Sequence, residues 1–250
     1  MTETTTQTIQ EKFRLPVKIT PSPILEASTE IRFDSTFPTE AIFGLIYNEF
    51  SSTYKDLEKL PILQIPEPVR SKDVNLMFQP QYRLRKENFL IHIGAKSISF
   101  SVQDPYPGWA IYLDECMDVL SRMNDLNFIK SATRFGLRYV DFFDDDIFGN
   151  IRLQIKLNDA VSLKNEVFLK TVIVNEDLRS NLQIGNSIKL KSQGLEKKGS
   201  VIDIDTYIDI DTDMFFEQIH PFLDKAHKYQ KELFFSLLTP EFLATLNPTY

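Results

Sequence analysis

The sequence predicts an α+β fold in which helices pack on one face of a mostly antiparallel, curved sheet, with a long helix near the C-terminus. Two observations lead to this prediction. Segments in which apolar and polar residues alternate with a period of two, typical of half-buried strands, recur along the chain. Three longer segments carry apolar residues at helical spacing without alternating one to one with the strands, which favours helices gathered on one face.

The chain opens with a predicted strand and a predicted helix. Leu25–Phe33 places apolar residues on one face and Glu26, Glu30 and Arg32 on the other. Pro38 then stands where a helix can begin, because the missing N–H group costs nothing in the first helical turn. Apolar residues follow at helical spacing over about four turns: Phe43, Ile46, Tyr47, Phe50 and Tyr54.

A proline-rich arm, three strands and a second helix come next. Residues 60–68 form the arm. We expect an edge strand over Leu76–Arg85, because Pro80 cannot donate a hydrogen bond to a neighbouring strand. Alternation on both sides of a short turn predicts a hairpin over 89–102. The apolar spacing of Trp109–Met123 predicts an amphipathic helix.

The second half is predicted to contain more strands and the longest helix. Ile129–Phe143 is a long strand candidate, and alternation predicts another strand over Ile151–Leu157. Val167–Val174 is mostly apolar, so we expect a strand buried on both faces. An apolar stripe over Phe215–Leu237 predicts a helix that Pro221 should kink or start.

A hairpin is predicted from two well-patterned strands, 182–191 and 201–211, joined by the loop 192–199. A single register satisfies several cross-strand pairs together. It sets three residues opposite three others: Lys189 opposite Asp203, Tyr207 opposite Gly185 and Arg179 opposite Asp213.

Composition suggests how the chain is organised. Residues 1–12 are rich in Thr and Gln and contain few apolar residues, so we expect a flexible tail. The 42% hydrophobic content and 20 Phe suffice for a core. We expect one domain over 13–250, with two packed halves, 13–128 and 129–250, as the alternative.

Composition also restricts the location and the partners. Cys116 is the single cysteine and cannot form an internal disulfide, which fits a reducing compartment. No apolar run reaches the roughly 18 residues that cross a bilayer, so we expect a cytoplasmic protein without a membrane partner. The net charge of −7 makes nucleic acid an unlikely default partner, although it does not exclude a local basic groove.

Standard catalytic signatures are absent from the sequence. It contains no P-loop, no G-x-G-x-x-G, no G-x-S-x-G and no H-E-x-x-H motif. A zinc site of Cys/His spacing needs more than one cysteine. His227 with Asp224 could form an oriented base, but no nucleophile accompanies it. Catalytic residues are therefore unassigned, and no cofactor is expected.

The most conspicuous motif is an acidic strand. Five aspartates project from one face at a spacing of two: Asp203, Asp205, Asp209, Asp211 and Asp213. A Mg²⁺ or Ca²⁺ site is one interpretation. A solvated sheet face is favoured, because side chains two apart on a strand lie about 6.6 Å apart. The metal candidates that lack a predicted basic partner are Asp205, Asp209 and Asp211.

A second motif is Arg134-Phe-Gly-Leu-Arg138-Tyr139. Arg134 and Arg138 share a strand face with Lys130 and form a candidate anion-binding site, because guanidinium groups grip phosphate or carboxylate. The arginines could instead pair with Glu30 and Glu26 of a neighbouring strand. We prefer this pairing, because buried guanidinium groups need partners.

Three spaced motifs resemble a family of prokaryotic proteins of about this length, which has a sporadic distribution and no characterised activity. They are the start Pro23-Ile-Leu-Glu-Ala27 with Glu30-Ile-Arg-Phe33, the central Arg134–Tyr139, and the ending from His227 to Thr239. The resemblance implies an accessory role, such as defence against mobile elements or partnership with them. It supplies no active-site residues.

These observations predict a non-enzymatic binding or interaction protein, with a protein partner or a homodimer formed through the sheet face or the long C-terminal helix. The alternative is a metal-dependent hydrolase that acts on a phosphate-containing substrate. That alternative would require a divalent metal on the acidic strand, with Arg134 and Arg138 gripping the phosphate.

Overall fold

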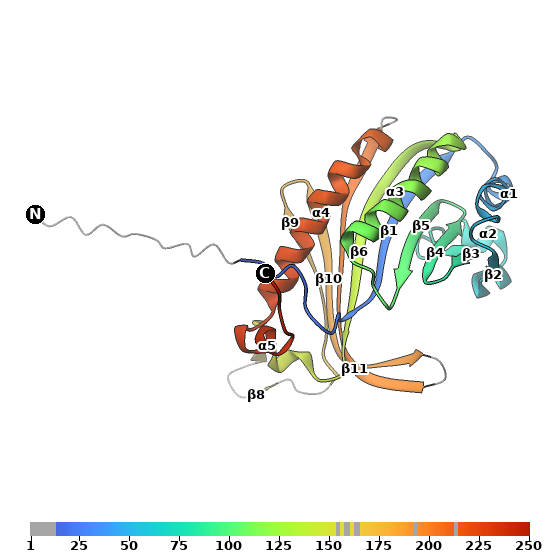
Figure 1. Ribbon diagram of the computed structural model, residues 1–250. Helices are drawn as coiled ribbons and strands as arrows, with labels where there is room; N and C mark the ends of the chain where they lie inside the picture. Colours follow the sequence, from blue (N-terminus) through green and yellow to red (C-terminus); the bar gives the residue numbers. More distant parts are fainter. Residues whose placement is uncertain (1–13, 154–155, 158–160, 163–165, 193–194, 213–214) are drawn as a thin grey trace, which may run out of the picture.

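A computed structural model describes residues 14–153, 156–157, 161–162, 166–192, 195–212 and 215–250. The predicted tail over 1–12 lies outside these residues. One nine-stranded sheet, antiparallel in every pairing, has the order β2-β3-β4-β5-β1-β6-β11-β10-β9 (Figure 1). Its strands are β1 (Ile24–Ser35), β2 (Asp56–Lys59), β3 (Pro80–Lys86), β4 (Phe89–Gly94), β5 (Ser97–Gln103), β6 (Ile129–Phe143), β9 (Phe168–Asn175), β10 (Leu178–Ser192) and β11 (Leu195–Thr212). Two short strands, β7 (Lys156–Leu157) and β8 (Val161–Ser162), form a separate pair.

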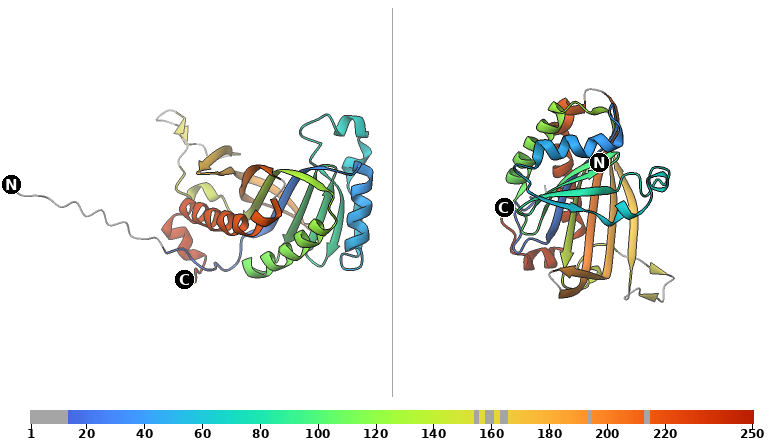
Figure 2. Two further views of the ribbon diagram at one scale, coloured as in Figure 1. Left: turned by 90° about the horizontal axis from the view of Figure 1, so that it is seen from above. Right: turned by 90° about the vertical axis from the view of Figure 1, so that its right-hand side faces the viewer.

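The main helices gather on one face of the sheet (Figures 1 and 2). The helical segments are α1 (Thr39–Phe50), η1 (Pro61–Gln64), α2 (Glu67–Arg70), α3 (Trp109–Asp125), η2 (Ile147–Gly149), α4 (Phe215–Leu237) and α5 (Pro240–Thr245). Alternate residues of β1, including Ala27 and Ile31, are buried with the apolar stripes of α1 and α3 in the larger of two core clusters. The predicted α+β class, with a long C-terminal helix, is confirmed. The opposite side of the sheet is called the open face below.

Both halves of the chain contribute to this sheet in the same order. Outward from the centre, the first half runs β1, β5, β4, β3 and the second runs β6, β11, β10, β9. The two halves meet where β1 pairs with β6. In the first half, β2 adds one more strand outside β3, whereas no described strand pairs outside β9. The predicted division at 128/129 therefore falls between sequence halves that share one sheet.

The predicted hairpin register is wrong. Gln183 lies opposite Asp203, and Lys189 lies opposite Lys198 rather than Asp203, because both strands continue to Ser192 and Leu195. Gly199, predicted to lie in the loop 192–199, stands inside β11. A Cβ atom there would lie 2.1 Å from a backbone oxygen of β6, so the glycine marks a close approach between strands.

Two other predicted contacts of that hairpin also differ. Tyr207 lies opposite Gly136 of β6 and Arg179 of β10, not opposite Gly185. Asp213, the predicted partner of Arg179, lies outside the described residues.

Two further element predictions need correction. Val167–Val174, expected to be buried on both faces, is the edge strand β9 and exposes much of its surface. Ile151 forms an isolated bridge with Leu238, and the regular strand near it is confined to Lys156–Leu157. Pro221, predicted to kink or start this helix, lies inside α4. None of the helices described here has the length and apolar character needed to span a bilayer.

Candidate binding surface

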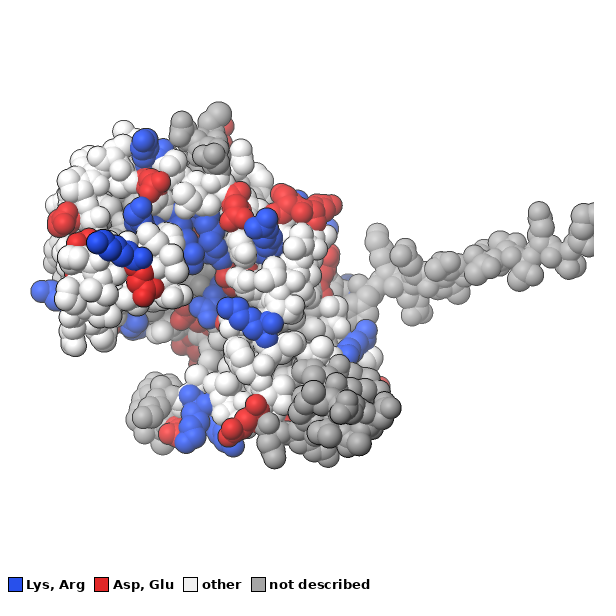
Figure 3. Space-filling view, turned by 180° about the vertical axis from the view of Figure 1, so that it is seen from behind, with Lys and Arg blue, Asp and Glu red and all other residues white. Residues whose placement is uncertain are grey.

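The open face of the sheet is hollowed, and Lys and Arg side chains gather around the hollow (Figure 3). It carries the polar residues of the alternating strands, such as Glu30 of β1 and Asp205 of β11, while their neighbours point to the helices. The central group, called the charged floor below, consists of five residues: Glu30, Arg134, Arg138, Asp203 and Asp205.

Arg134 is held on every side. Its Nη1 donates to Glu30 over 2.7 Å, and its Nη2 donates to both carboxylate oxygens of Asp205 over 2.8 and 2.7 Å. The guanidinium carbon lies 4.3 Å from the ring centroid of Tyr207. A Cβ atom at Gly136 would lie 3.0 Å from Nη1, so the glycine makes room for this side chain. With 9% exposure, Arg134 clamps three strands together and offers little to a ligand.

The guanidinium group of Arg138 is hydrogen-bonded on its buried side and exposed to solvent on its outer side. Its Nε and Nη2 donate to Asp203 over 2.8 and 2.7 Å, and this bond is the main cause that raises the pKa of the guanidinium. Gln183 also donates to Asp203 over 3.1 Å. The Arg138 side chain is 45% exposed, whereas that of Asp203 is 8% exposed. The carboxylate therefore lies deep and the cation faces outward, with Nη1 making no hydrogen bond to a described residue.

The structure thus gives each arginine at least one carboxylate partner. Glu30 pairs with Arg134, as the pairing interpretation supposed, but Glu26 forms no ion pair with Arg138 among the described residues. Burial raises the pKa of Glu26, and the nearby charges of Arg138 and Arg83 oppose that rise. Whether Arg138 binds an anion from outside stays a prediction.

Lys130, predicted to share a strand face with Arg134 and Arg138, does not continue the regular alternation that places these arginines on one face of β6. The pairing of β1 with β6 shifts by one residue between Arg134 and Ala132, so Ala132 turns into the core. A bulge of this kind reverses the face on which later residues project, and no sequence period reveals it.

The candidate metal ligands are engaged by basic or amide groups. Asp205 accepts from Arg134 and from Asn181, the latter over 3.2 Å, and Asp209 accepts from Arg179 over 2.8 Å. The side chain of Asp211 lies outside the described part of the structure. Within that part, no group of three or more His, Cys, Asp or Glu side chains is placed to hold one metal ion. Asp205 would have to release Arg134 before it could bind a cation.

His227 belongs to an aromatic cluster on the helix side. Its Nδ1 lies 3.1 Å from the hydroxyl of Tyr139, and its ring stacks on Trp109 with 4.0 Å between centroids. Burial lowers the pKa of His227 to about 4, so the ring is neutral near pH 7. Asp224, the predicted partner, instead lies 3.3 Å from His220. Trp109 anchors α3 against α4 here.

Asp141 is a buried carboxyl group that the sequence motifs do not single out. It is 4% exposed, lies on the same side of β6 as Tyr139 and Phe143, and forms no hydrogen bond or ion pair with a described residue. Burial raises its pKa to about 8, with a smaller contribution from the charge of Asp203. The alternation of β6 contains the signal, because it places this aspartate among the apolar positions of the strand.

An apolar row lies along β9, with β10 between it and the charged floor. Phe168, Val172 and Val174 of β9 are 62%, 52% and 66% exposed. They lie opposite Gly185, Asn181 and Arg179 of β10, which places them on the open face. These three side chains are called the β9 row below. Its backbone edge is unpaired among the described strands.

Comparison with protein-family models yields no match to this chain, and comparison with curated proteins yields none either.

Proposed function

We propose that this protein is a non-enzymatic interaction protein that works as a dimer, with two copies joined edge to edge through β9. The observation that carries the proposal is the β9 row on an edge strand whose outer side pairs with none of the described strands. An edge strand with free backbone groups and exposed apolar side chains is a template for another strand. Monomeric proteins usually protect such an edge with charges, prolines or covering segments.

The other edge of the sheet supports strand addition at this position. Counted from the centre, β3 and β9 hold equivalent places, and β2 pairs with β3 as an outer strand. The position beside β9 that corresponds to β2 holds no described strand. A strand from a second copy would complete the same arrangement on both edges.

The sequence of β9 is suited to antiparallel pairing with itself. With the two-fold axis at Thr171, Phe168 lies opposite Val174 of the second copy and Lys170 lies opposite Val172. On the helix side, Leu169 would face Ile173 of the second copy. Cross-strand pairs of this kind each contribute roughly 0.2–1 kcal/mol.

The charged floor gives the dimer a further role. Two sheets joined through β9 would present one continuous open face with an outward guanidinium of Arg138 from each copy. We propose that this face receives acidic groups of a partner protein, because the Arg138 guanidinium lies above the Asp203 carboxylate that holds it. An accessory role in defence or in mobile elements, as the family resemblance implies, is compatible with such a surface.

Sedimentation velocity over a concentration series tests the dimer. The wild type is expected to sediment as a dimer. Val172→Lys would set lysine opposite Lys170 twice across the interface and weaken the dimer at least about tenfold, ~1.4 kcal/mol. Val172→Glu would set a carboxylate opposite the same lysine and preserve the dimer.

The matched control is Val69→Lys, because Val69 is exposed to the same extent as Val172, 52% in each case. This variant is expected to behave as the wild type. A wild type that stays monomeric at 100 μM, or a Val172→Lys dimer as tight as the wild type, would refute pairing through β9.

A further inference from the structure

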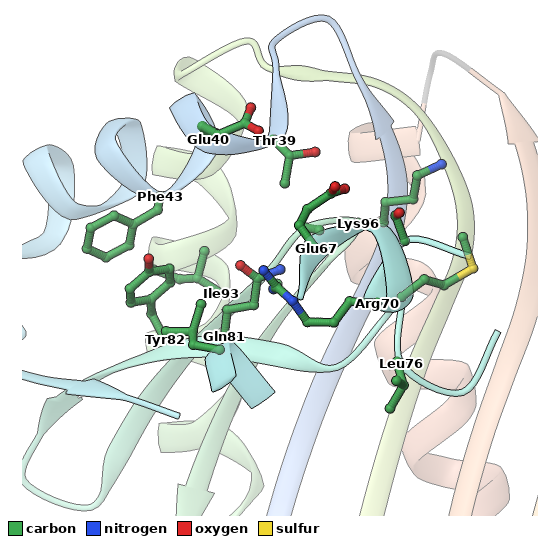
Figure 4. A pocket seen from close by; sticks show the side chains of 15 residues that line it. Thr39, Glu40, Phe43, Glu67, Arg70, Leu76, Gln81, Tyr82, Ile93 and Lys96 are labelled. Atoms are coloured by element: carbon green, nitrogen blue, oxygen red, sulfur yellow. The ribbon is translucent and has the colours of Figure 1, made fainter. Parts of the chain in front are cut away.

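A cavity of about 290 Å³ lies between the start of α1, α2 and the turn that joins β4 to β5 (Figure 4). Its volume is close to the lower end of the roughly 300–1,000 Å³ typical of small-molecule sites. It lies near the β2 edge of the sheet, at the opposite end from the β9 row. Its existence and occupant are therefore independent of the proposed dimer.

Arg70 supplies an unsatisfied donor to this cavity. Its Nε donates to the backbone oxygen of Ile65 over 2.9 Å, which fixes the guanidinium group. The Nη1 atom is buried and has no hydrogen-bond partner in the described part of the chain. The side chain extends from α2 across the cavity toward Gln81 (Figure 4). A buried charged donor without a partner is costly, so this arrangement points to an acceptor from outside.

The wall opposite Arg70 is aromatic and apolar. Phe43 stacks on Tyr82 with 3.9 Å between ring centroids and 20° between planes. Ile93 of β4 lies in the same wall. This side of the cavity suits an apolar body of modest size.

The cavity also contains carboxylates without cationic partners. Glu40 and Glu67 line it, and neither takes part in an ion pair with a described residue. Lys96, the second cation of the lining, is already paired with Asp34 over 3.1 Å. Two carboxylates without a described cationic partner, beside one guanidinium group with an unsatisfied Nη1, disfavour a doubly charged phosphate. They match a ligand that carries both signs of charge.

We propose that this cavity binds a small zwitterion with an apolar body, as in a free apolar amino acid. The ligand carboxylate accepts from Arg70, whose planar fork suits a carboxylate. The ammonium group faces Glu67 and Glu40, and the apolar side chain packs on Phe43 and Tyr82.

Isothermal titration calorimetry with L-phenylalanine and L-leucine tests the site. Binding of at least one of them is expected for the wild type and should weaken at least about tenfold in Arg70→Met. Arg179→Met is the control, because Arg179 pairs with Asp209 on the open face, away from the cavity, and its loss should leave binding unchanged.

Two analogues separate the charges of the ligand. Phenethylamine lacks the carboxylate, and 3-phenylpropionate lacks the ammonium group, so both should bind more weakly than L-phenylalanine. Glu67→Gln should weaken L-phenylalanine and leave 3-phenylpropionate unaffected. This variant also serves if Arg70→Met fails to fold. No heat from either amino acid at 10 mM, or equal binding to 3-phenylpropionate, would overturn the assignment.

Discussion

Replacing Asp141 with asparagine should remove a pH dependence of stability that the buried carboxyl imposes on the protein. The side chain is 4% exposed and has no hydrogen-bond partner among the described residues, and asparagine has nearly the same shape. Burial raises its pKa from 3.8 to about 8. The folded protein therefore holds a proton that the unfolded chain releases over this range.

The sign and size follow from that difference. The stability that Asp141 contributes when it is protonated is fully present below pH 3.8, the pKa of the carboxyl in the unfolded chain. It is lost as the pH rises through about 8, the pKa in the folded protein. The slope is about 1.4 kcal/mol per pH unit. Between pH 5 and pH 8, the free energy of unfolding of the wild type should therefore fall by about 4 kcal/mol relative to Asp141→Asn.

Two histidines act in the opposite direction. Burial lowers the pKa values of His92 and His227 to about 4, so their stabilisation is present above the unfolded value of 6.5 and is lost as the pH falls. The wild type and Asp141→Asn both contain these histidines. The contribution of the histidines to the free energy of unfolding therefore cancels when the two are compared.

Urea unfolding followed by circular dichroism at pH 5, 6, 7 and 8 measures this difference. The advantage of Asp141→Asn should grow steadily toward pH 8. A difference that stays constant within about 1 kcal/mol would show that the carboxyl titrates alike in the folded and unfolded chain, and the reasoning from burial would fail.

Two pairs of substitutions separate buried features from exposed ones. Arg134→Met should lower the free energy of unfolding by about 3–5 kcal/mol, because it leaves two carboxylates without their cation, whereas Arg179→Met, which removes an exposed pair, should lower it by less than about 1 kcal/mol. Similar losses in urea unfolding would contradict the burial argument. Gly199→Ala should be strongly destabilising, because its Cβ would lie 2.1 Å from a backbone oxygen, whereas Gly44→Ala has no atom within 4 Å and should stabilise α1 by about 1 kcal/mol. Thermal unfolding compares the two, and an equal shift in both would be inconsistent with these contacts.

Periodicity predicted most of the fold because each element carries its own pattern. The alternation of β1 and the stripe of α4 each follow from one stretch of sequence, and the structure confirms both. The β9 strand shows the limit of this reasoning. A short apolar strand has the same composition in the centre of a sheet and at its edge. The exposure of Val172 therefore depends on the order of the strands in the sheet, which the sequence of β9 does not contain.

The candidate site was predictable only in part, for a similar reason. Complementary charge on adjacent strands predicted a pair between Arg134 and Glu30, which the structure shows. The second partner, Asp205, comes from β11, and its contact with Arg134 depends on how β11 pairs with β6, which no pattern within either strand specifies. The cavity around Arg70 involves segments brought together by tertiary packing, and no spacing along the chain indicates it.

The meeting of the two halves at β1 and β6 has a consequence for folding kinetics. The hairpins β3-β4-β5 and β9-β10-β11 join neighbours in sequence, whereas the bond from Arg134 to Glu30 closes a separation of 104 residues. Closing a long loop carries a larger entropy penalty than closing a hairpin, so we expect each outer set of strands to form before the central pair. The ion pairs of Arg134 would then form after the folding transition state. Their strength would therefore affect the unfolding rate rather than the folding rate.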